Sequence, residues 1–554
     1  DKENRYPIRD FVVQYGETDY QFFTRICSEW GINFYWEHNA NGHTLILSDE
    51  ANKHQIIDNE AYQKIAYYPP DHKTSEEYLH EFSVIAKMVS GAFASDDYDY
   101  AQASASISDK KHDVLPYPDA QKSIQTGEKK EQTTSEKYEI YDYPAEIVQP
   151  QAGPNQSGNN AAAEQVLRNQ WNLERLQQRH FTATALGYIR GIVCGQTFEL
   201  EKHPSSLANI QWLVLGTNLT MMDLAEESQR KELPDDILNY LTQTNQKWHI
   251  DCHVELIPAS VNPRPDRVKR PKAALHHAIV VGEAEEGAIY TDSFGRIKVQ
   301  FKWDRYGQLN QNSSCWVRVN EPWAGNQMGA VFTPRIGQEV LIDFIDHDPD
   351  LPVCIGKVNN SDNLPNWQLP QNKALAGFRS RELPLGNSNE GRSNHLVFDD
   401  TEGHIQAQLS SDHAHSQLSL GDITRIENNS GRKDARGQGF ELRTDDWGTA
   451  RAAKGLYLTT YAREKAKSTQ MDAFEVQLLL DEAKGLVETL SKVANEYQAE
   501  KLTSAEQLDA FAKITKSELP QHPSTTDSAS VLTDLMEQGN VSLNNLNKQI
   551  EETK

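Results

Sequence analysis

Residues 296–303 read Arg-Ile-Lys-Val-Gln-Phe-Lys-Trp, which is the clearest alternation of polar and apolar side chains in the chain. Successive side chains of a β-strand point to opposite faces, so this pattern predicts a strand with one buried face. The apolar face would consist of Ile297, Val299, Phe301 and Trp303, and the polar face of Arg296, Lys298, Gln300 and Lys302.

Further β-rich runs lie on both sides of this strand, and turn residues such as Gly, Pro, Asn and Asp separate them. Five short strands in one domain-sized stretch are what a small Greek-key barrel of the OB type requires. We therefore predict an OB barrel around residues 296–303. Its other strands would be 277–282, 315–320, 339–345 and 353–358.

The N-terminal region predicts a helix followed by a hairpin. Thr18 and Gln21 have the spacing of a capping box, which marks the start of a helix, and Gly31 is placed to end it. The runs 32–37 and 43–48 are rich in β-forming residues and are joined by a short loop that contains Gly. Such a pair of runs is typical of a β-hairpin.

The region before the OB barrel has a mixed pattern. Residues 96–137 are polar and have no sustained period, which predicts a surface segment that is either a long excursion or partly disordered. Residues 161–178 show a helical spacing of apolar side chains. Short β-rich runs follow, and their Gly and polar breaks favour a barrel or sandwich over βαβ units. These runs are 181–186, 197–200 and 211–215.

Beyond the OB barrel the pattern changes three times. Residues 364–394 are rich in Pro, Asn, Gln and Gly, which predicts a linker. Residues 394–460 contain brief apolar runs, each too short to bury a core alone, so we expect rungs that stack on something else. From 470 to 497 apolar residues recur every three or four positions, which predicts a helix with an apolar seam of about three heptads. A second helix would begin at Thr503.

The composition sets limits on function. A chain of 554 residues predicts about three to five domains. The net charge of −25 would repel a phosphate backbone, so we expect no nucleic acid partner. No run approaches the ~20 apolar residues of a membrane helix, so we expect no membrane anchor. The five cysteines are spread without a framework spacing, which predicts reduced thiols in a cytosolic protein.

Several motifs together resemble one family, the VgrG spike proteins of type VI secretion systems. Two motifs resemble the hub half of that family. One is Gln14-Tyr15-Gly16-Glu17-Thr18-Asp19 followed by Trp30-Gly31-Ile32, and the other is Tyr141-Asp142-Tyr143-Pro144. The most specific motifs lie in the OB region, at 289–304, 315–319, 323–325, 334–340 and 348–350, in the family's order and spacing. Residues 439–445 resemble the start of the needle in the same family.

The resemblance implies a mainly β, multidomain fold with phage-hub-like β-barrels, an OB-fold barrel, the start of a trimeric β-needle and a C-terminal helical segment. It also implies a homotrimer that sits on an Hcp tube, meets baseplate components, is capped by a PAAR-repeat tip and carries effector or adaptor proteins. Such a spike assembles in the cytoplasm and is then injected by sheath contraction without a signal peptide. The expected domains are hub 1–275, OB fold 276–363, linker 364–394, needle start 395–465 and helical segment 466–554.

The ends of the sequence differ from the family pattern. The chain begins at Asp1, part-way through the expected first hub barrel, and stops at Lys554, before a needle tip or an appended effector domain. We therefore expect a fragment of a longer protein.

Two groups of residues could bind a metal ion. His249, Cys252 and His253 could supply zinc ligands, but strand alternation would put Cys252 on the face opposite the histidines. An acidic run could bind calcium or act as paired carboxylates, but its prolines and its spacing favour a turn between strands. His413 and His415 lie with Asp412 in a short polar run, for which we expect exposed strand positions. The acidic run comprises Asp343, Asp346, Asp348 and Asp350.

The sequence offers little support for catalysis. It contains no G-x-S-x-G elbow, H-E-x-x-H motif or phosphate-binding Gly loop, and only the short stretch 364–394 occupies the position where related phage spikes can carry a lysozyme domain. We expect a structural protein without catalytic residues, cofactor or metal. The alternative is a specialised spike whose C-terminal part is, or extends into, an enzymatic effector domain.

The predicted C-terminal helix supplies the candidate partner-binding residues, Leu486, Leu490 and Val493. Three heptads are the lower limit for a coiled coil, so self-association and packing on the same subunit or a partner stay open. In either case an apolar stripe of this length needs a cover. We expect a collar that these three side chains hold in place and whose exposed part docks an effector or its adaptor.

Overall fold

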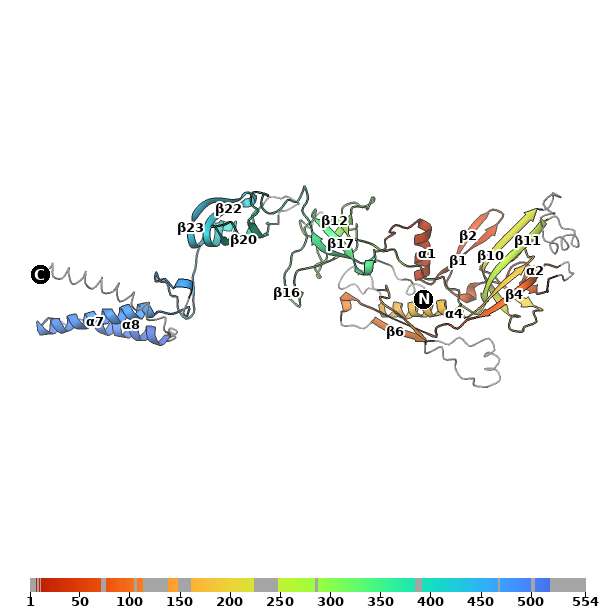
Figure 1. Ribbon diagram of the computed structural model, residues 1–554, viewed down its shortest axis with the longest axis horizontal. Coiled ribbons are helices and arrows are strands. Elements are labelled where there is room, and N and C mark those ends of the chain that lie inside the picture. Colours follow the sequence, from red (N-terminus) through yellow and green to blue (C-terminus); the bar gives the residue numbers. More distant parts are fainter. Residues whose placement is uncertain are drawn as a thin grey trace, which may run out of the picture. The chain divides into compact units, whose positions relative to one another are not determined.

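The computed structural model (Figure 1) divides into two compact units, residues 1–443 and 444–554. Each unit is described by itself. The mainly β, multidomain fold class is confirmed. The residues described are 6, 9, 11–70, 76–103, 107–112, 138–147, 161–223, 248–283, 287–383, 391–466, 469–499 and 504–518.

The helix and hairpin predicted near the N-terminus are both present. Helix α1 (Asp19–Glu29) starts at the Thr18–Gln21 capping box, with both reciprocal hydrogen bonds formed. Gly31 has a φ of 63°, the left-handed conformation that a glycine after a helix adopts readily. Strands β1 (Asn33–Asn39) and β2 (Gly42–Ser48) pair antiparallel.

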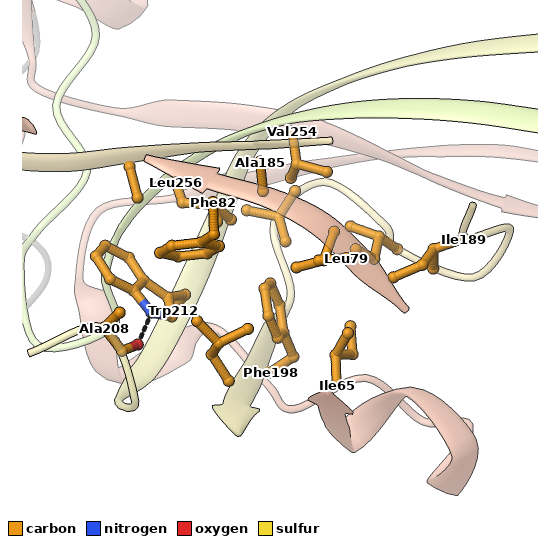
Figure 2. Close-up of a cluster of buried hydrophobic side chains, with 14 of the residues drawn as sticks. Ile65, Leu79, Phe82, Ala185, Ile189, Phe198, Ala208, Trp212, Val254 and Leu256 are labelled. Carbon is orange, nitrogen blue, oxygen red and sulfur yellow. Dashed lines mark hydrogen bonds between the residues drawn. The ribbon is translucent and has the colours of Figure 1, made fainter. Parts of the chain in front are cut away.

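A six-stranded sheet forms the largest core, and its strand order is β3-β9-β10-β11-β8-β4. β8 buries every second residue, as its apolar alternation requires. Trp212 belongs to this core and has no exposed surface, and its indole Nε1 donates a hydrogen bond of 2.8 Å to the carbonyl oxygen of Ala208 (Figure 2). The strands are β3 (Lys64–Ala66), β4 (Leu79–Ala86), β8 (Phe181–Gly187), β9 (Thr197–Glu201), β10 (Gln211–Asp223) and β11 (Trp248–Pro258), and the short helix α2 (Glu60–Gln63) precedes β3.

A smaller sheet lies against helix α4 (Ala161–Gln177) and has the order β6-β5-β7. Its strands are β5 (Ala92–Asp97), β6 (Ile107–His112) and β7 (Glu139–Asp142). Strand β6 falls inside 96–137, which was expected to be a surface excursion. β6 pairs with β5, so residues 107–112 form a regular strand, which was not expected in this polar stretch. Residues 113–137 lie outside the described residues.

The predicted OB barrel is formed by a five-stranded sheet in the order β13-β12-β17-β18-β14. An isolated bridge between Ile297 and Val317 joins the two outer strands, so the sheet closes on itself. Ile297, Val299 and Phe301 are buried inside, as the alternation predicts. The strands are β12 (His276–Val281), β13 (Lys298–Phe301), β14 (Arg318–Val319), β17 (Glu339–Phe344) and β18 (Pro352–Lys357), and a two-stranded hairpin is formed by β15 (Ala324–Gly325) and β16 (Met328–Gly329).

The two ends of the 296–303 stretch depart from the prediction. Trp303 is 42% exposed, although it was expected on the buried face. Arg296 was expected in solvent but is 1% exposed. It forms an ion pair with Asp292 at 2.6 Å and its guanidinium lies over the ring of Phe294, so paired charge and aromatic contact replace water around it.

A five-stranded antiparallel sheet follows the OB barrel, in the order β19-β20-β21-β22-β23. The runs between residues 394 and 443 that were expected to be rungs therefore form a continuous sheet within one chain. Its first strand, β19 (Leu375–Arg379), lies in the stretch expected to be a linker and pairs with β20. The other strands are β20 (Asn394–Asp399), β21 (Gln406–Ser411), β22 (Ser416–Glu427) and β23 (Gly431–Arg443).

The second unit contains helices α7 (Phe474–Glu496) and α8 (Ser504–Glu518), which lie side by side (Figure 1). Both helices were predicted, although the cap residue proposed for the second, Thr503, lies outside the described residues. Among the residues that the structure describes, no helix is long and apolar enough to span a bilayer.

Candidate assembly surfaces

The face of the β19–β23 sheet that carries large apolar side chains is exposed. In the ladder, Phe378 lies opposite Leu396, which lies opposite Leu409. Leu409 in turn pairs with Leu418, and Leu418 with Leu442. A parallel row consists of Ala376, Phe398, Ala407, Leu420 and Phe440. The Phe and Leu side chains of the two rows are 37% to 76% exposed.

The opposite face of the same sheet is buried and largely polar. The His395 ring Nε2 lies 2.8 Å from the Oε1 of Gln408, and the Nε2 of Gln408 donates to the Oγ of Ser419 at 2.9 Å. Gln406 similarly donates to the Oγ1 of Thr424 at 2.5 Å. Hydrogen bonds thus satisfy these side chains across three neighbouring strands.

This distribution is the reverse of an ordinary half-buried sheet, in which the apolar face packs inward. An apolar patch of this kind on a soluble chain usually marks an interaction surface. One end of the patch is partly covered within the chain, because the ring of Phe378 stacks on Phe332 of the OB region at a centroid distance of 5.3 Å. The other Phe and Leu side chains of the two rows remain at least 37% exposed in the described part of the chain.

Residues 444–463 of the second unit are extended and mostly exposed. They include Leu456 at 60% and Leu458 at 84% exposed, from the run expected to be a rung. Neither residue belongs to a strand of the described part of the chain.

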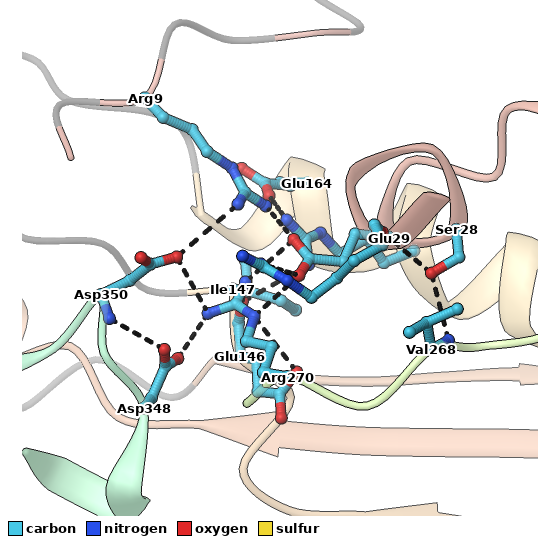
Figure 3. Close-up of polar contacts among 12 residues, drawn as sticks. Arg9, Ser28, Glu29, Glu146, Ile147, Glu164, Val268, Arg270, Asp348 and Asp350 are labelled. Atoms are coloured by element: carbon cyan, nitrogen blue, oxygen red, sulfur yellow. Dashed lines mark hydrogen bonds and ion pairs between the residues drawn. The ribbon is translucent and has the colours of Figure 1, made fainter. Parts of the chain in front are cut away.

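A buried cluster of charges joins the hub region to the OB barrel (Figure 3). Arg270, in the segment between β11 and β12, lies at its centre. Its Nε forms an ion pair with Glu29 of α1 at 2.9 Å, and its Nη1 pairs with Asp348, just after β17. Arg9 approaches the other oxygen of Glu29 at 2.6 Å, and the backbone N–H of Val13 donates to Asp350 at 2.8 Å.

The charges in this cluster influence one another strongly. Burial opposes ionisation of Glu29, but Arg270 and Arg9 outweigh it and hold the pKa of this carboxyl well below its usual range. Asp350 behaves differently: burial and the neighbouring Asp348 raise its pKa to about 6, although Arg270 and Arg9 favour the charged form. The cluster therefore holds one carboxylate firmly ionised and another that titrates at mildly acidic pH.

The turn expected between two strands is present in the acidic run, with Asp346 in a short turn after β17. Asp348 and Asp350 have an additional role that was not expected, because they are buried and form ion pairs with Arg270. Their partner, Arg270, was not predicted from the sequence. The spacing of Arg25 and Glu29, four residues apart on α1, was a local signal for a charged pair in this cluster, and their side chains are 0% and 4% exposed.

The other candidate ligands do not converge. Cys252 is buried and His253 is exposed, on opposite faces of β11 as predicted, while the side chain of His249 lies outside the described residues. His413 and His415 are exposed in a short turn, not in a strand as expected. No group of three or more potential metal ligands occurs among the described side chains.

The candidate partner-binding residues lie on one side of α7. Leu486 is 41%, Leu490 47% and Val493 45% exposed, so the described residues leave each of them partly open to solvent. Lys484 pairs with Asp509 of α8 at 2.5 Å, which places α8 against a different side of the helix.

Comparison with known proteins supplies the family. Three family models match: the phage tail baseplate hub (GPD) at residues 1–225, the type VI secretion system/phage-baseplate injector OB domain at 280–358, and the putative type VI secretion system Rhs element Vgr at 386–494. The type VI secretion system spike protein VgrG2a of Pseudomonas aeruginosa is 32% identical over 491 residues, which cover 88% of this chain and 53% of that protein. The chain belongs to the VgrG family. The resemblance read from its motifs is confirmed.

VgrG proteins differ in length, and this chain spans about half the length of the curated relatives it matches. A VgrG relative from Vibrio cholerae, the actin cross-linking toxin VgrG1, is 28% identical over 405 residues, or 72% of this chain and 32% of the toxin. Among solved structures, the Francisella PdpA-VgrG complex matches with a TM-score of 0.42 and 10% identity, over 78% of this chain and 57% of that one.

Proposed function

We propose that this chain is the hub, OB barrel and proximal needle of a type VI secretion spike, and that it works as a homotrimer. The observation that carries the proposal is the exposed apolar face of the β19–β23 sheet. In a threefold assembly the apolar rows of three copies would face one another and leave water. The same assembly would supply neighbours for Leu456 and Leu458.

The buried charge cluster suits a part that transmits force. Arg270 connects α1 and the OB barrel through buried ion pairs, and such pairs break only at a high cost because the separated charges would stay desolvated. A hub and OB barrel held in this way would move as one piece when the spike is pushed.

The partners in this proposal follow from family membership. The hub would sit on an Hcp tube within the baseplate, the needle would receive a PAAR-repeat tip, and effector or adaptor proteins would travel with the spike. The chain would assemble in the cytoplasm and leave it by injection. Residues 1–275 would act as hub, 276–363 as OB barrel, 395–465 as needle start and 466–554 as helical collar, with β19 extending the needle sheet into residues 364–394.

We also propose that this part of the protein has no enzymatic activity of its own. Its VgrG relative in P. aeruginosa is named a spike protein, whereas the V. cholerae relative is named a toxin and is only 32% covered by this chain. The test is to assay the purified chain for hydrolysis of peptidoglycan, phospholipid and nucleotides. Turnover that one point substitution abolishes would contradict the proposal.

Light scattering tests the trimer. The full chain at micromolar concentration should have three times its chain mass of 62.7 kDa. Leu409→Asp places a charge in the middle of the apolar face, at a position 57% exposed in one copy, and should reduce the mass to that of a monomer without unfolding it. Leu409→Ile is the matched control and should stay trimeric. A monomeric wild-type chain would contradict the proposal.

A further inference from the structure

Helix α7 carries a strict heptad pattern that its own neighbour does not cover. The apolar positions alternate by three and four residues from Val476 to Tyr497 without a charged interruption. This spacing keeps them on one narrow seam along the helix. The seam positions are Val476, Leu479, Ala483, Leu486, Leu490, Val493 and Tyr497.

Helix α8 packs on the flank of this seam. Leu480, Val487 and Ala494 follow the seam positions by one residue in each heptad and are less exposed than the leucines of the seam. The ion pair from Lys484 to Asp509 lies on the same flank. The leucines of the seam, in contrast, are 41% to 48% exposed, and Tyr497 at its end is 81% exposed. The packing of α8 therefore accounts for one stripe of α7 and leaves the seam open.

We propose that the seam binds the same seam of other copies of this chain, so that the α7 helices form a parallel, in-register coiled coil. This inference rests on the proposed trimer but concerns a separate surface. It adds a second contact between copies, C-terminal to the needle sheet.

The pattern favours a second copy over an unrelated partner. A helix that lies on a globular partner or a sheet usually presents an apolar stripe wider than 100°, whereas a seam restricted to two positions in seven suits identical helices. Because α8 packs beside the stripe of Leu480, Val487 and Ala494, the seam is the apolar part of α7 that stays more exposed. Its 22 residues would extend over about 33 Å at 1.5 Å per residue, which is long enough for three heptads of knobs-into-holes packing.

The position of α7 in the chain also favours this occupant. The needle sheet ends at Arg443, and α7 begins at Phe474. Copies joined through the sheet would present their α7 helices in the same direction and at a local concentration in the millimolar range. A seam of three heptads is weak as an isolated peptide, but such tethering makes its association intramolecular.

Cysteine cross-linking in the full chain tests the seam. Four native cysteines are buried and Cys194 is partly exposed, so the experiment uses a Cys194→Ser background. Leu490→Cys places a thiol on the seam, where mild oxidation should link two copies within minutes. Glu488→Cys is the matched control, because it is exposed and lies on the far side of α7 from the seam. It should cross-link at least tenfold more slowly.

The mass of each variant separates this inference from the proposed function. If the chain is trimeric and Leu490→Cys links no faster than Glu488→Cys, the seam does not bind copies and the inference is overturned, while the trimer stands. If the chain is monomeric, both are overturned. As a second measurement, Leu490→Asp should raise the amide exchange rate of α7 at least tenfold in a chain that remains trimeric through its sheet. Unchanged exchange in a trimer would also overturn the inference.

Discussion

The OB barrel and the β19–β23 sheet are two neighbouring β-structures that hide opposite faces. The barrel closes through the Ile297–Val317 bridge, so its apolar faces point inward and Val299 has no exposed surface. The β19–β23 sheet stays open, buries polar side chains such as Gln408 and exposes Leu409 beside it. The alternation of polar and apolar residues therefore predicts that a strand has two different faces. It does not predict which face is buried, because that depends on how the sheet closes or packs.

The largest effect is expected from a charge inside the barrel. Val299→Asp would bury a carboxylate among apolar side chains at a cost of about 4 kcal/mol or more, and the chain should unfold or lose its OB barrel. The same change at Leu409 should cost less than about 1 kcal/mol in a single copy, because the position is exposed there. Urea unfolding of both variants at low protein concentration measures the difference. Equal destabilisation would show that the β19–β23 sheet covers its apolar face within one chain.

The second effect concerns the charge cluster between the hub and the barrel. Arg270→Met should destabilise the chain by about 3 to 5 kcal/mol, because it leaves Glu29 and Asp348 buried without their main partner. Arg267→Met is the matched control: Arg267 is three residues away, and its ion pairs are about one third exposed, so we expect a loss of about 0 to 1 kcal/mol. Thermal unfolding should separate the variants, and similar melting temperatures would argue against a structural role for the cluster.

A smaller effect is expected on the polar side of the β19–β23 sheet. Gln408→Ala removes the partner of both His395 and Ser419 and should cost about 1 to 3 kcal/mol. Gln438→Ala, at an exposed position of the same sheet, should change stability by less than about 0.5 kcal/mol. Hydrogen exchange of β20 to β22 is the measurement. Exchange that is equally fast in both variants would show that the network does not stabilise the sheet.

The smallest effect is a difference in pH response between the two regions. Burial lowers the pKa of His395 below its ordinary 6.5, so the folded sheet binds a proton less readily than the unfolded chain and loses stability as the pH falls through that value. Asp350 is the reverse case. Its pKa is about 6 against an ordinary 3.8, so its contribution to stability increases as the pH falls from 7 toward 4.

Amide exchange at pH 7.5 and 6.0, corrected for intrinsic rates, measures this difference. The β19–β23 sheet should open more readily at the lower pH and the charge cluster less readily. His395→Gln should remove the response of the sheet, and Asp350→Asn that of the cluster. A change in the same direction in both regions would contradict the assignment of the two groups.

Sequence reasoning predicted local features better than burial. The capping box at Thr18, the hairpin after it and the strands of the OB barrel depend on neighbouring residues, and the structure confirms them. Burial depends on distant contacts. Arg296 is buried because Asp292 and aromatic rings surround it, and Glu29 meets Arg270 across 241 positions of sequence.

The candidate site was only partly predictable for the same reason. The heptad spacing located Leu486, Leu490 and Val493 on one side of a helix, and the structure places them there. The heptad spacing could not show that α8 would pack beside the adjacent stripe of Leu480, Val487 and Ala494. The apolar rows of the β19–β23 sheet could not be predicted either, because they depend on the register that aligns Leu396, Leu409 and Leu418 across three strands.

The exposed apolar rows of the β19–β23 sheet also have a consequence for the newly synthesised chain. The hub and the OB barrel bury their apolar cores within one copy, whereas Phe398, Leu420 and Phe440 of this sheet are exposed in a single copy. In the proposed trimer, covering this face is a concentration-dependent step, and a single chain is prone to aggregate until that step is complete. Production of copies close together, or temporary shielding by a chaperone, would shorten that exposure.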